Sequence, residues 1–74
     1  MITPAQCKAA RTLLGWDYVR LAAAAGCTNY TAMAFELGRN RPKWSTREKL
    51  RRAFEAAGVE FVGPGARLQK DGDA

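Results

Sequence analysis

The sequence predicts a small all-α domain of four to five short helices that ends in a short C-terminal β strand or hairpin. Apolar residues recur at three- and four-residue spacing over most of the chain, as they do in amphipathic helices. Capping residues and glycines divide this pattern into short pieces. The stretch 59–62 instead alternates with a period of two residues, which is typical of a strand. A length of 74 residues leads us to expect one domain.

The first predicted helix begins close to the N-terminus. Thr3 is a suitable N-cap, and Pro4 occupies the first helical position, where its missing N–H costs nothing. The helix is expected to end at about Leu14, because Gly15 follows as a stop. Its apolar residues, including Cys7, keep helical spacing and are expected to face the core.

Two further helices are expected in the next part of the chain. Asp17 is the candidate cap of the second helix, whose four consecutive alanines, 22–25, favour helix and permit a neighbouring helix to approach closely. Gly26 ends this helix, and Thr28 is the candidate cap of a third helix over 29–37. A helix pair joined by three or four residues that include a glycine is the pattern of a helix-turn-helix.

A basic loop over 38–44 is expected to lead into a fourth helix. The segment Ser45-Thr46-Arg47-Glu48 has the pattern of a capping box, in which the first and last side chains each bond the other's backbone amide. We therefore expect the helix to begin there. Helical spacing predicts that it buries Leu50, Phe54 and Ala57.

The C-terminal part is expected to contain a strand over 59–62, a turn at 63–65 and a return over 66–68. Together these segments make a hairpin, or an edge on which a second subunit can pair. We therefore divide the chain into a helix-turn-helix domain over 1–62 and a C-terminal turn and polar tail over 63–74.

Positive charge is concentrated in one segment of the chain. The net charge is +5, and residues 39–52 carry seven Lys or Arg side chains against the single acid Glu48. Such a run is the footprint expected of a surface that meets polyphosphate. The alternative is a solvated helix face, on which Arg47, Arg51 and Arg52 are solubilising charges paired with acidic neighbours.

Several kinds of chemistry have no residues to support them. The chain has no histidine, and Cys7 and Cys27 stand far apart, so we expect no metal site and no disulfide. We find no acid/base pair, glycine-rich phosphate loop or activated nucleophile at a suitable spacing, so we expect neither an enzyme nor a cofactor. The longest nearly apolar stretch, 21–27, is too short to span a membrane, which favours a cytoplasmic protein.

Motifs that point to one family occur in order over most of the chain. They are Thr3-Pro4-Ala5-Gln6, Ala10-Arg11-Thr12-Leu13-Leu14-Gly15-Trp16, Leu21-Ala22, Ala25-Gly26, Phe35-Glu36, Gly38-Arg39, Pro42 and the segment 51–61. Residues 3–62 thereby resemble the phage-repressor/Cro-type (XRE-like) helix-turn-helix transcriptional regulators, in particular their short single-domain bacterial members. The resemblance implies a repressor-like helical bundle with its helix-turn-helix at 18–37, which binds double-stranded DNA on the nucleoid as a homodimer.

The resemblance also implies that the helix 29–37 reads the major groove. The outward positions of this helix, and therefore the candidate base-reading residues, are Asn29, Tyr30, Met33 and Ala34. Asn29 can bond adenine, and Met33 or Ala34 can touch a thymine methyl, which favours A·T-containing sites. This set is unusually apolar. The face around Tyr30 and Met33 is therefore also a candidate docking surface for a protein partner, as in an anti-repressor, a co-regulator or an antitoxin.

In this family the loop after the reading helix runs along phosphates. The candidate phosphate contacts are Tyr18, Thr28, Arg39, Asn40, Arg41 and Lys43. Asp17-Tyr18 departs from the family, whose members usually carry Ser or Thr followed by Gln at this point. A tyrosine hydroxyl can still donate a hydrogen bond to a phosphate.

Two further predictions concern structure rather than recognition. Arg11 and Glu36 match an arginine and a glutamate that pair between helices in the family, so they are predicted to form a structural clamp. Trp16 and Trp44 are assigned to packing rather than to phosphate binding.

Overall fold

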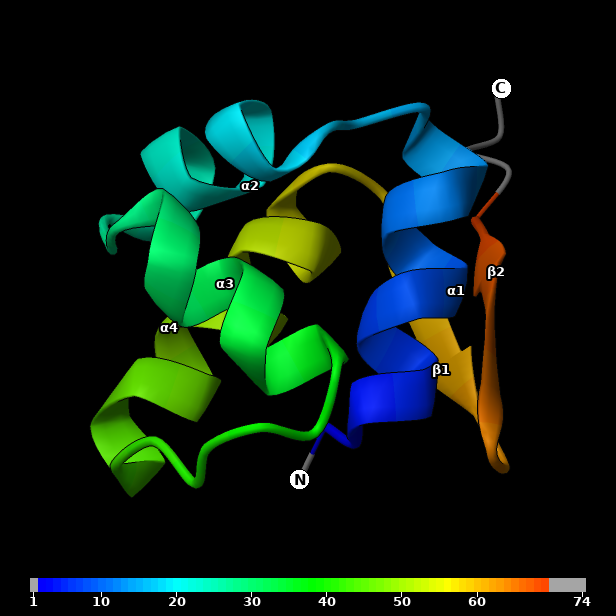
Figure 1. The fold of residues 1–74 in the computed structure, drawn as a ribbon. Helices are drawn as coiled ribbons and strands as arrows, with labels where there is room; N and C mark the ends of the chain where they lie inside the picture. Colours follow the sequence, from blue (N-terminus) through cyan, green and yellow to red (C-terminus); the bar gives the residue numbers. More distant parts are fainter. Residues whose placement is uncertain (1, 70–74) are drawn as a thin grey trace.

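Four helices and a two-stranded antiparallel hairpin make up residues 2–69, the part of the chain that the computed structural model describes (Figure 1). In chain order they are α1 (Pro4–Leu14), α2 (Tyr18–Ala25), α3 (Asn29–Glu36), α4 (Trp44–Ala56), β1 (Val59–Val62) and β2 (Gly65–Leu68). The predicted fold class is confirmed as a mostly α-helical small domain with a C-terminal hairpin. From residue 70 onward, the predicted polar tail lies outside the described residues.

The first three helices begin at the capping residues that the sequence predicts. Thr3, Asp17 and Thr28 each have an extended backbone, and each side chain accepts a hydrogen bond from the amide three residues later, at 2.8 to 3.1 Å. These bonds satisfy amides that the first turn of a helix leaves without partners. Helix boundaries in this half of the chain are therefore set by local sequence.

The start of α4 differs from the prediction. The helix begins at Trp44, and Lys43 precedes it without any side-chain capping bond. The expected capping box does not form, because Glu48 is engaged by a later residue of the same helix: Arg51 Nε donates to Glu48 Oε2 at 3.1 Å. The carboxylate that should reach back to the helix start is therefore held by an arginine that follows it.

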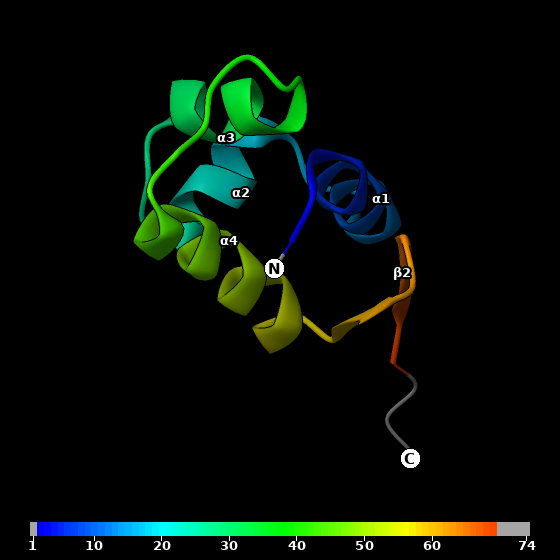
Figure 2. The ribbon, with the colours of Figure 1, turned by 90° about the horizontal axis from the view of Figure 1, so that it is seen from below.

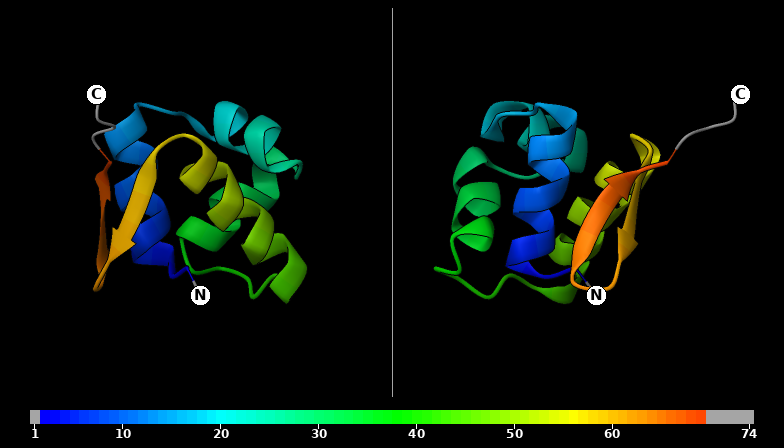
Figure 3. Two further views of the ribbon diagram at one scale, coloured as in Figure 1. Left: turned by 180° about the vertical axis from the view of Figure 1, so that it is seen from behind. Right: turned by 90° about the vertical axis from the view of Figure 1, so that its right-hand side faces the viewer.

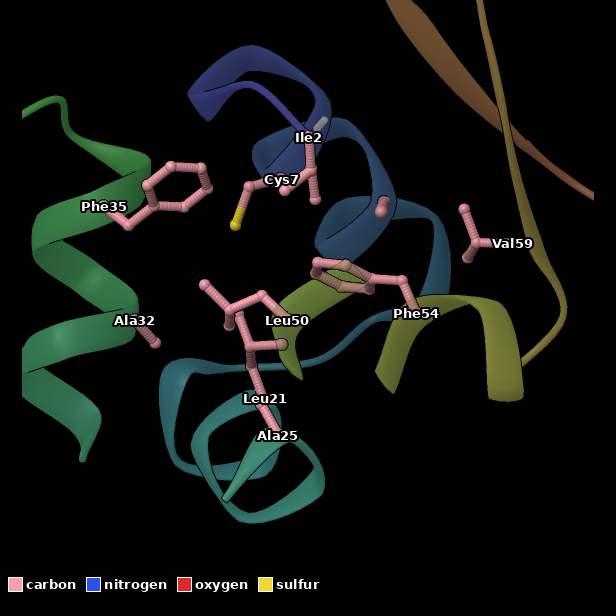
Figure 4. Close-up of a cluster of buried hydrophobic side chains, with 10 residues drawn as sticks. Ile2, Cys7, Leu21, Ala25, Ala32, Phe35, Leu50, Phe54 and Val59 are labelled. Atoms are coloured by element: carbon pink, nitrogen blue, oxygen red, sulfur yellow. The ribbon is translucent and has the colours of Figure 1, made fainter. Parts of the chain in front are cut away.

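The core lies where the four helices meet. Cys7 of α1, Leu21 of α2, Phe35 of α3 and Phe54 of α4 are buried and point toward one another (Figure 4). Trp16 packs against this cluster, with its ring stacked on Phe54 at a centroid distance of 5.9 Å, as predicted. Burial of these apolar side chains is the main force that holds such short helices together.

Two packing predictions are wrong. Trp44 is 60% exposed, because it stands at the first position of α4 and outside the packed turns of that helix. Ala57 is also exposed, because α4 ends at Ala56 and Ala57 is the residue that closes it. The buried residues of α4 are Leu50 and Phe54.

The hairpin is a structural part of the domain. Val59 pairs with Leu68 and Phe61 with Ala66, and a two-residue connection joins the strands. Gly63 has φ of 54°, and a proline follows it, which is the pattern of a type II′ turn that only glycine accommodates easily at its first central position. Residues 63–68 therefore belong to the folded unit and not to a tail.

A glutamine ties the hairpin to the first helix. Gln6 is buried, and its Nε2 donates to the carbonyl of Gly63 at 2.9 Å. Its Oε1 accepts from the amide of Thr3 at 3.0 Å, so the same side chain also completes the cap of α1. In consequence β2 packs along α1, while β1 packs against α4 (Figure 3).

The hairpin and α3 lie on opposite sides of the molecule, with α1 and the core between them (Figure 1, Figure 2). None of the helices within residues 2–69 combines the length and the apolar character needed to cross a membrane.

Candidate nucleic-acid interface

A three-residue connection sets the angle between α2 and α3. Gly26 ends α2 with φ of 75°, and its amide donates to the carbonyl of Ala22 at 2.8 Å. Thr28 then returns to an extended backbone and caps α3. At the contact between the two helices the small residues Ala22, Ala25 and Ala32 are all buried, so the helix backbones can approach closely.

The outward face of α3 is largely apolar and uncovered. Asn29 is exposed, Tyr30 is 63% exposed and Met33 is half-buried. Leu37, immediately after the helix, is 51% exposed and was not predicted as part of this face. Its position seven residues after Tyr30 and four after Met33 is the helical spacing that could have identified it.

Ala34 does not belong to this face, so its predicted contact with bases is wrong. Its relative exposure is 0%. The chain folds back over the last turn of α3, where the amide of Arg39 donates to the carbonyl of Ala34 at 2.8 Å. A methyl group in that position has no access to a groove.

The predicted clamp between Arg11 and Glu36 is confirmed. Arg11 Nε donates to Glu36 Oε1 at 2.7 Å, and a second guanidinium nitrogen donates to Oε2 at 2.9 Å, so the pair is bidentate. The remaining guanidinium nitrogen donates to the carbonyl of Trp16 at 2.9 Å. The clamp therefore joins α1, the α1–α2 connection and the end of α3.

Tyr18 is a third member of the clamp. Its hydroxyl donates to Glu36 Oε2 at 3.0 Å, and its ring lies 4.6 Å from the guanidinium carbon of Arg11. The proton that was predicted to bond a phosphate is thus used within the protein, which corrects the role expected of Tyr18. A hydrophobic ring with a polar tip suits a position where one side of the residue is buried.

The clamp lowers the pKa of Glu36. Burial alone raises this pKa, but the hydrogen bonds from Arg11 and Tyr18 outweigh burial and hold it below its usual value of 4.5. The carboxylate is therefore ionised at neutral pH although its side chain is only 2% exposed. Nearby, burial is the main cause that raises the pKa of the Cys7 thiol to about 12, and the Glu36 carboxylate adds to this.

Thr28 is also occupied by the fold. Its hydroxyl oxygen accepts from the amide of Thr31, and the hydroxyl donates to Thr31 Oγ1 at 2.9 Å. The predicted phosphate contact at Thr28 would have to replace this second bond. Thr28 therefore serves first to start α3.

The exposed cations after α3 carry the positive charge of this surface. Arg39, Arg41 and Lys43 are exposed, and none of them forms an ion pair with any residue in the described part of the chain. They lie on a loop that runs along the outside of the molecule from α3 to α4 (Figure 2). Their charge is therefore available to an anionic partner beside the exposed face of α3.

Other predicted basic residues behave differently. Arg51 bonds both Glu48 and Glu55, which matches the alternative of paired charges on a solvated helix face. Asn40 was predicted to contact phosphate, but its Oδ1 atom is buried. The structure thus separates the cations of the loop from those of α4.

Comparison of the sequence with protein-family models gives no match, and comparison with curated proteins gives none either. The function is therefore inferred from the residues and the geometry described above.

Proposed function

We propose that the protein is a sequence-specific double-stranded DNA-binding regulator of the phage-repressor/Cro type, in which residues 18–37 form the helix-turn-helix. The observation that carries this proposal is the juxtaposition of an uncovered helix face on α3 with three exposed, unpaired cations on the loop that follows it. Arg39, Arg41 and Lys43 bind phosphates, and α3 enters the major groove. This activity would place the protein on the nucleoid.

The dimensions of α3 suit this role. Eight residues make a helix of about 12 Å, which compares with a major groove about 12 Å wide. In helix-turn-helix proteins the N-terminal residues of the second helix reach the base edges. Asn29 occupies that position, and its amide can bond N6 and N7 of adenine. Met33, half-buried on the same face, offers an apolar contact for a thymine methyl.

The clamp fixes how this helix is presented. Arg11 and Tyr18 hold Glu36, in the last turn of α3, against the first and second helices. A helix held at its C-terminal end presents its N-terminal turn in a constant orientation, which base recognition requires. The clamp therefore acts as a positioning device and does not touch DNA.

Useful specificity needs two copies of so short a reading helix. Dimers of this class bind half-sites about one helical turn of DNA apart. We propose a homodimer for this reason. The hairpin edge lies on the side away from α3 (Figure 2), so pairing through it leaves both reading helices uncovered.

The proposal is tested by fluorescence-anisotropy titration of the protein with a random duplex pool at two salt concentrations, followed by sequencing of the retained DNA. We expect enrichment of a palindromic A·T-containing motif. Each phosphate contact contributes about 0.9 to the slope of log affinity against log salt. The triple variant R39A/R41A/K43A should lower that slope by about 2.7.

A matched control is Arg67→Ala. Arg67 is an exposed arginine on the hairpin, remote from α3, and it pairs with Glu60. This variant should leave the salt slope unchanged. Binding without salt dependence, or an equal effect of Arg67→Ala and Arg41→Ala, would refute the assignment of the loop to phosphates.

A second candidate function is protein docking through the same face of α3. The exposure of Tyr30 and Leu37, which are large apolar side chains, favours it. Absence of any DNA binding would support this alternative. It predicts that the product of a neighbouring gene, such as the toxin of a toxin–antitoxin pair, forms a complex that Tyr30→Ala abolishes while Arg41→Ala does not.

A further inference from the structure

A cavity of about 350 Å³ lies behind the basic loop. Three apolar side chains line part of it: Pro4 at the start of α1, Phe35 of α3 and Pro42 of the loop. Its size falls at the small end of the range for sites that bind small organic molecules. The cavity is thus bounded by the segments that the candidate interface joins.

The polar side of the cavity contains two buried atoms without partners. Arg47 Nε and Asn40 Oδ1 are both buried, and neither forms a hydrogen bond with any group in residues 2–69. Both residues line the cavity. Because a buried donor or acceptor without a partner is costly, a ligand that offers an acceptor to Arg47 and a donor to Asn40 would gain affinity from both.

The charge around the cavity selects an anion. Arg41 and Arg47 line it, and no acidic side chain does. Arg47 also lies in the first part of α4, whose N-terminal amides have no side-chain cap and whose dipole favours negative charge. A planar guanidinium matches the geometry of a carboxylate particularly well.

The apolar wall separates this ligand from a DNA phosphate. A phosphodiester needs cations and donors but gains nothing from Phe35 and two prolines. An apolar ring that carries a carboxylate and a hydroxyl would use all three elements of the cavity: the apolar wall, the guanidinium and the amide oxygen.

We propose that the cavity between the basic loop, α3 and α4 binds a small aromatic carboxylate that also carries a hydroxyl group. Arg47 binds the carboxylate, Asn40 accepts from the hydroxyl, and the ring lies against Phe35. This site does not depend on the proposed DNA binding, because its ligand is a free small molecule.

The test uses ¹⁵N-labelled full-length protein and 4-hydroxybenzoate, followed by amide chemical shifts. We expect saturable shifts centred on residues 38–47. Benzoate, which lacks the hydroxyl, phenol, which lacks the carboxylate, and inorganic phosphate, which lacks the ring, should each bind more weakly. Arg47→Met keeps the apolar stem but removes the charge, and it should weaken 4-hydroxybenzoate binding at least about tenfold.

The control variant is Arg52→Met, an equal change at an exposed position of the same helix that does not line the cavity. It should leave the affinity unchanged. The proposal is overturned if 4-hydroxybenzoate gives no saturable shifts, if phosphate binds as tightly at the same amides, or if Arg47→Met binds as well as the unaltered chain. The ligand series on the unaltered protein decides the question even if Arg47→Met fails to fold.

Discussion

Replacing Arg11 with methionine should remove a large part of the stability of the domain. The change keeps most of the side-chain length but leaves Glu36, whose side chain is 2% exposed, with Tyr18 as its remaining side-chain donor. Breaking a buried ion pair costs about 3–5 kcal/mol. Since the Arg11 side chain is 20% exposed, water can partly replace it, and we expect a loss of about 2–4 kcal/mol.

This loss should depend on pH with a defined sign. In the unaltered protein the pKa of Glu36 is below 4.5, so the ion pair stabilises the fold fully above that value. The contribution is lost as pH falls through the folded pKa. In Arg11→Met the carboxylate is buried without its cation, so its folded pKa rises and protonation relieves the buried charge. The difference in unfolding free energy between the two proteins should therefore shrink as the pH falls from 7 toward 4.

The assay is urea unfolding followed by circular dichroism at pH 7 and pH 4. A domain of this length has a total stability of about 4–11 kcal/mol, so the expected loss is easily measured. Arg51→Met is the comparison variant, because its ion pairs lie at the surface of α4 and should contribute no more than about 1 kcal/mol. A loss below about 0.5 kcal/mol at pH 7 for Arg11→Met, or the same loss at both pH values, would show that the clamp does not hold α3 in place.

Three other changes test separate parts of the structure. Cys7, with its pKa of about 12, should be alkylated by iodoacetamide at pH 8 only as fast as the domain unfolds, which mass spectrometry can follow; alkylation at the rate of a free thiol would contradict its burial. Gly26→Ala should cost about 1–2 kcal/mol in thermal unfolding, because its φ is positive although an added Cβ meets no atom within 4 Å, whereas Gly65→Ala, without a positive φ, should cost little; equal costs would refute this explanation. Gln6→Ala should cost about 2 kcal/mol and accelerate amide hydrogen exchange in both strands, and unchanged exchange there would show that Gln6 does not anchor the hairpin.

The parts of the fold that were predicted from sequence depend on short-range chemistry. Thr3, Asp17 and Thr28 cap helices because their side chains bond amides three residues away, and Gly26 ends a helix because of its own backbone freedom. None of these features requires a distant partner. The clamp was predicted differently, since only the family resemblance connected Arg11 with Glu36.

The features that were missed depend on neighbours far away in the sequence or on competition within a helix. Ala34 lies on the surface of an isolated helix, but the chain that follows α3 covers it. Tyr18 donates to a carboxylate 18 residues later, which no local pattern specifies. The capping box of Glu48 is a sound local pattern, yet Arg51 competes for the same carboxylate. Asn40 and Arg47 become part of one cavity only through the path of the loop.

The bond between Gln6 and Gly63 has a consequence for the order of events during protein synthesis. The first helix is among the earliest segments to be translated, but the side chain that completes its cap also needs a carbonyl 57 residues later. A nascent chain that ends before this glycine can form α1 locally and cannot fix it against the hairpin. Stable closure of the domain must therefore wait until the segment around Gly63 has left the ribosome, and truncation before that point should leave a helical but loosely packed chain.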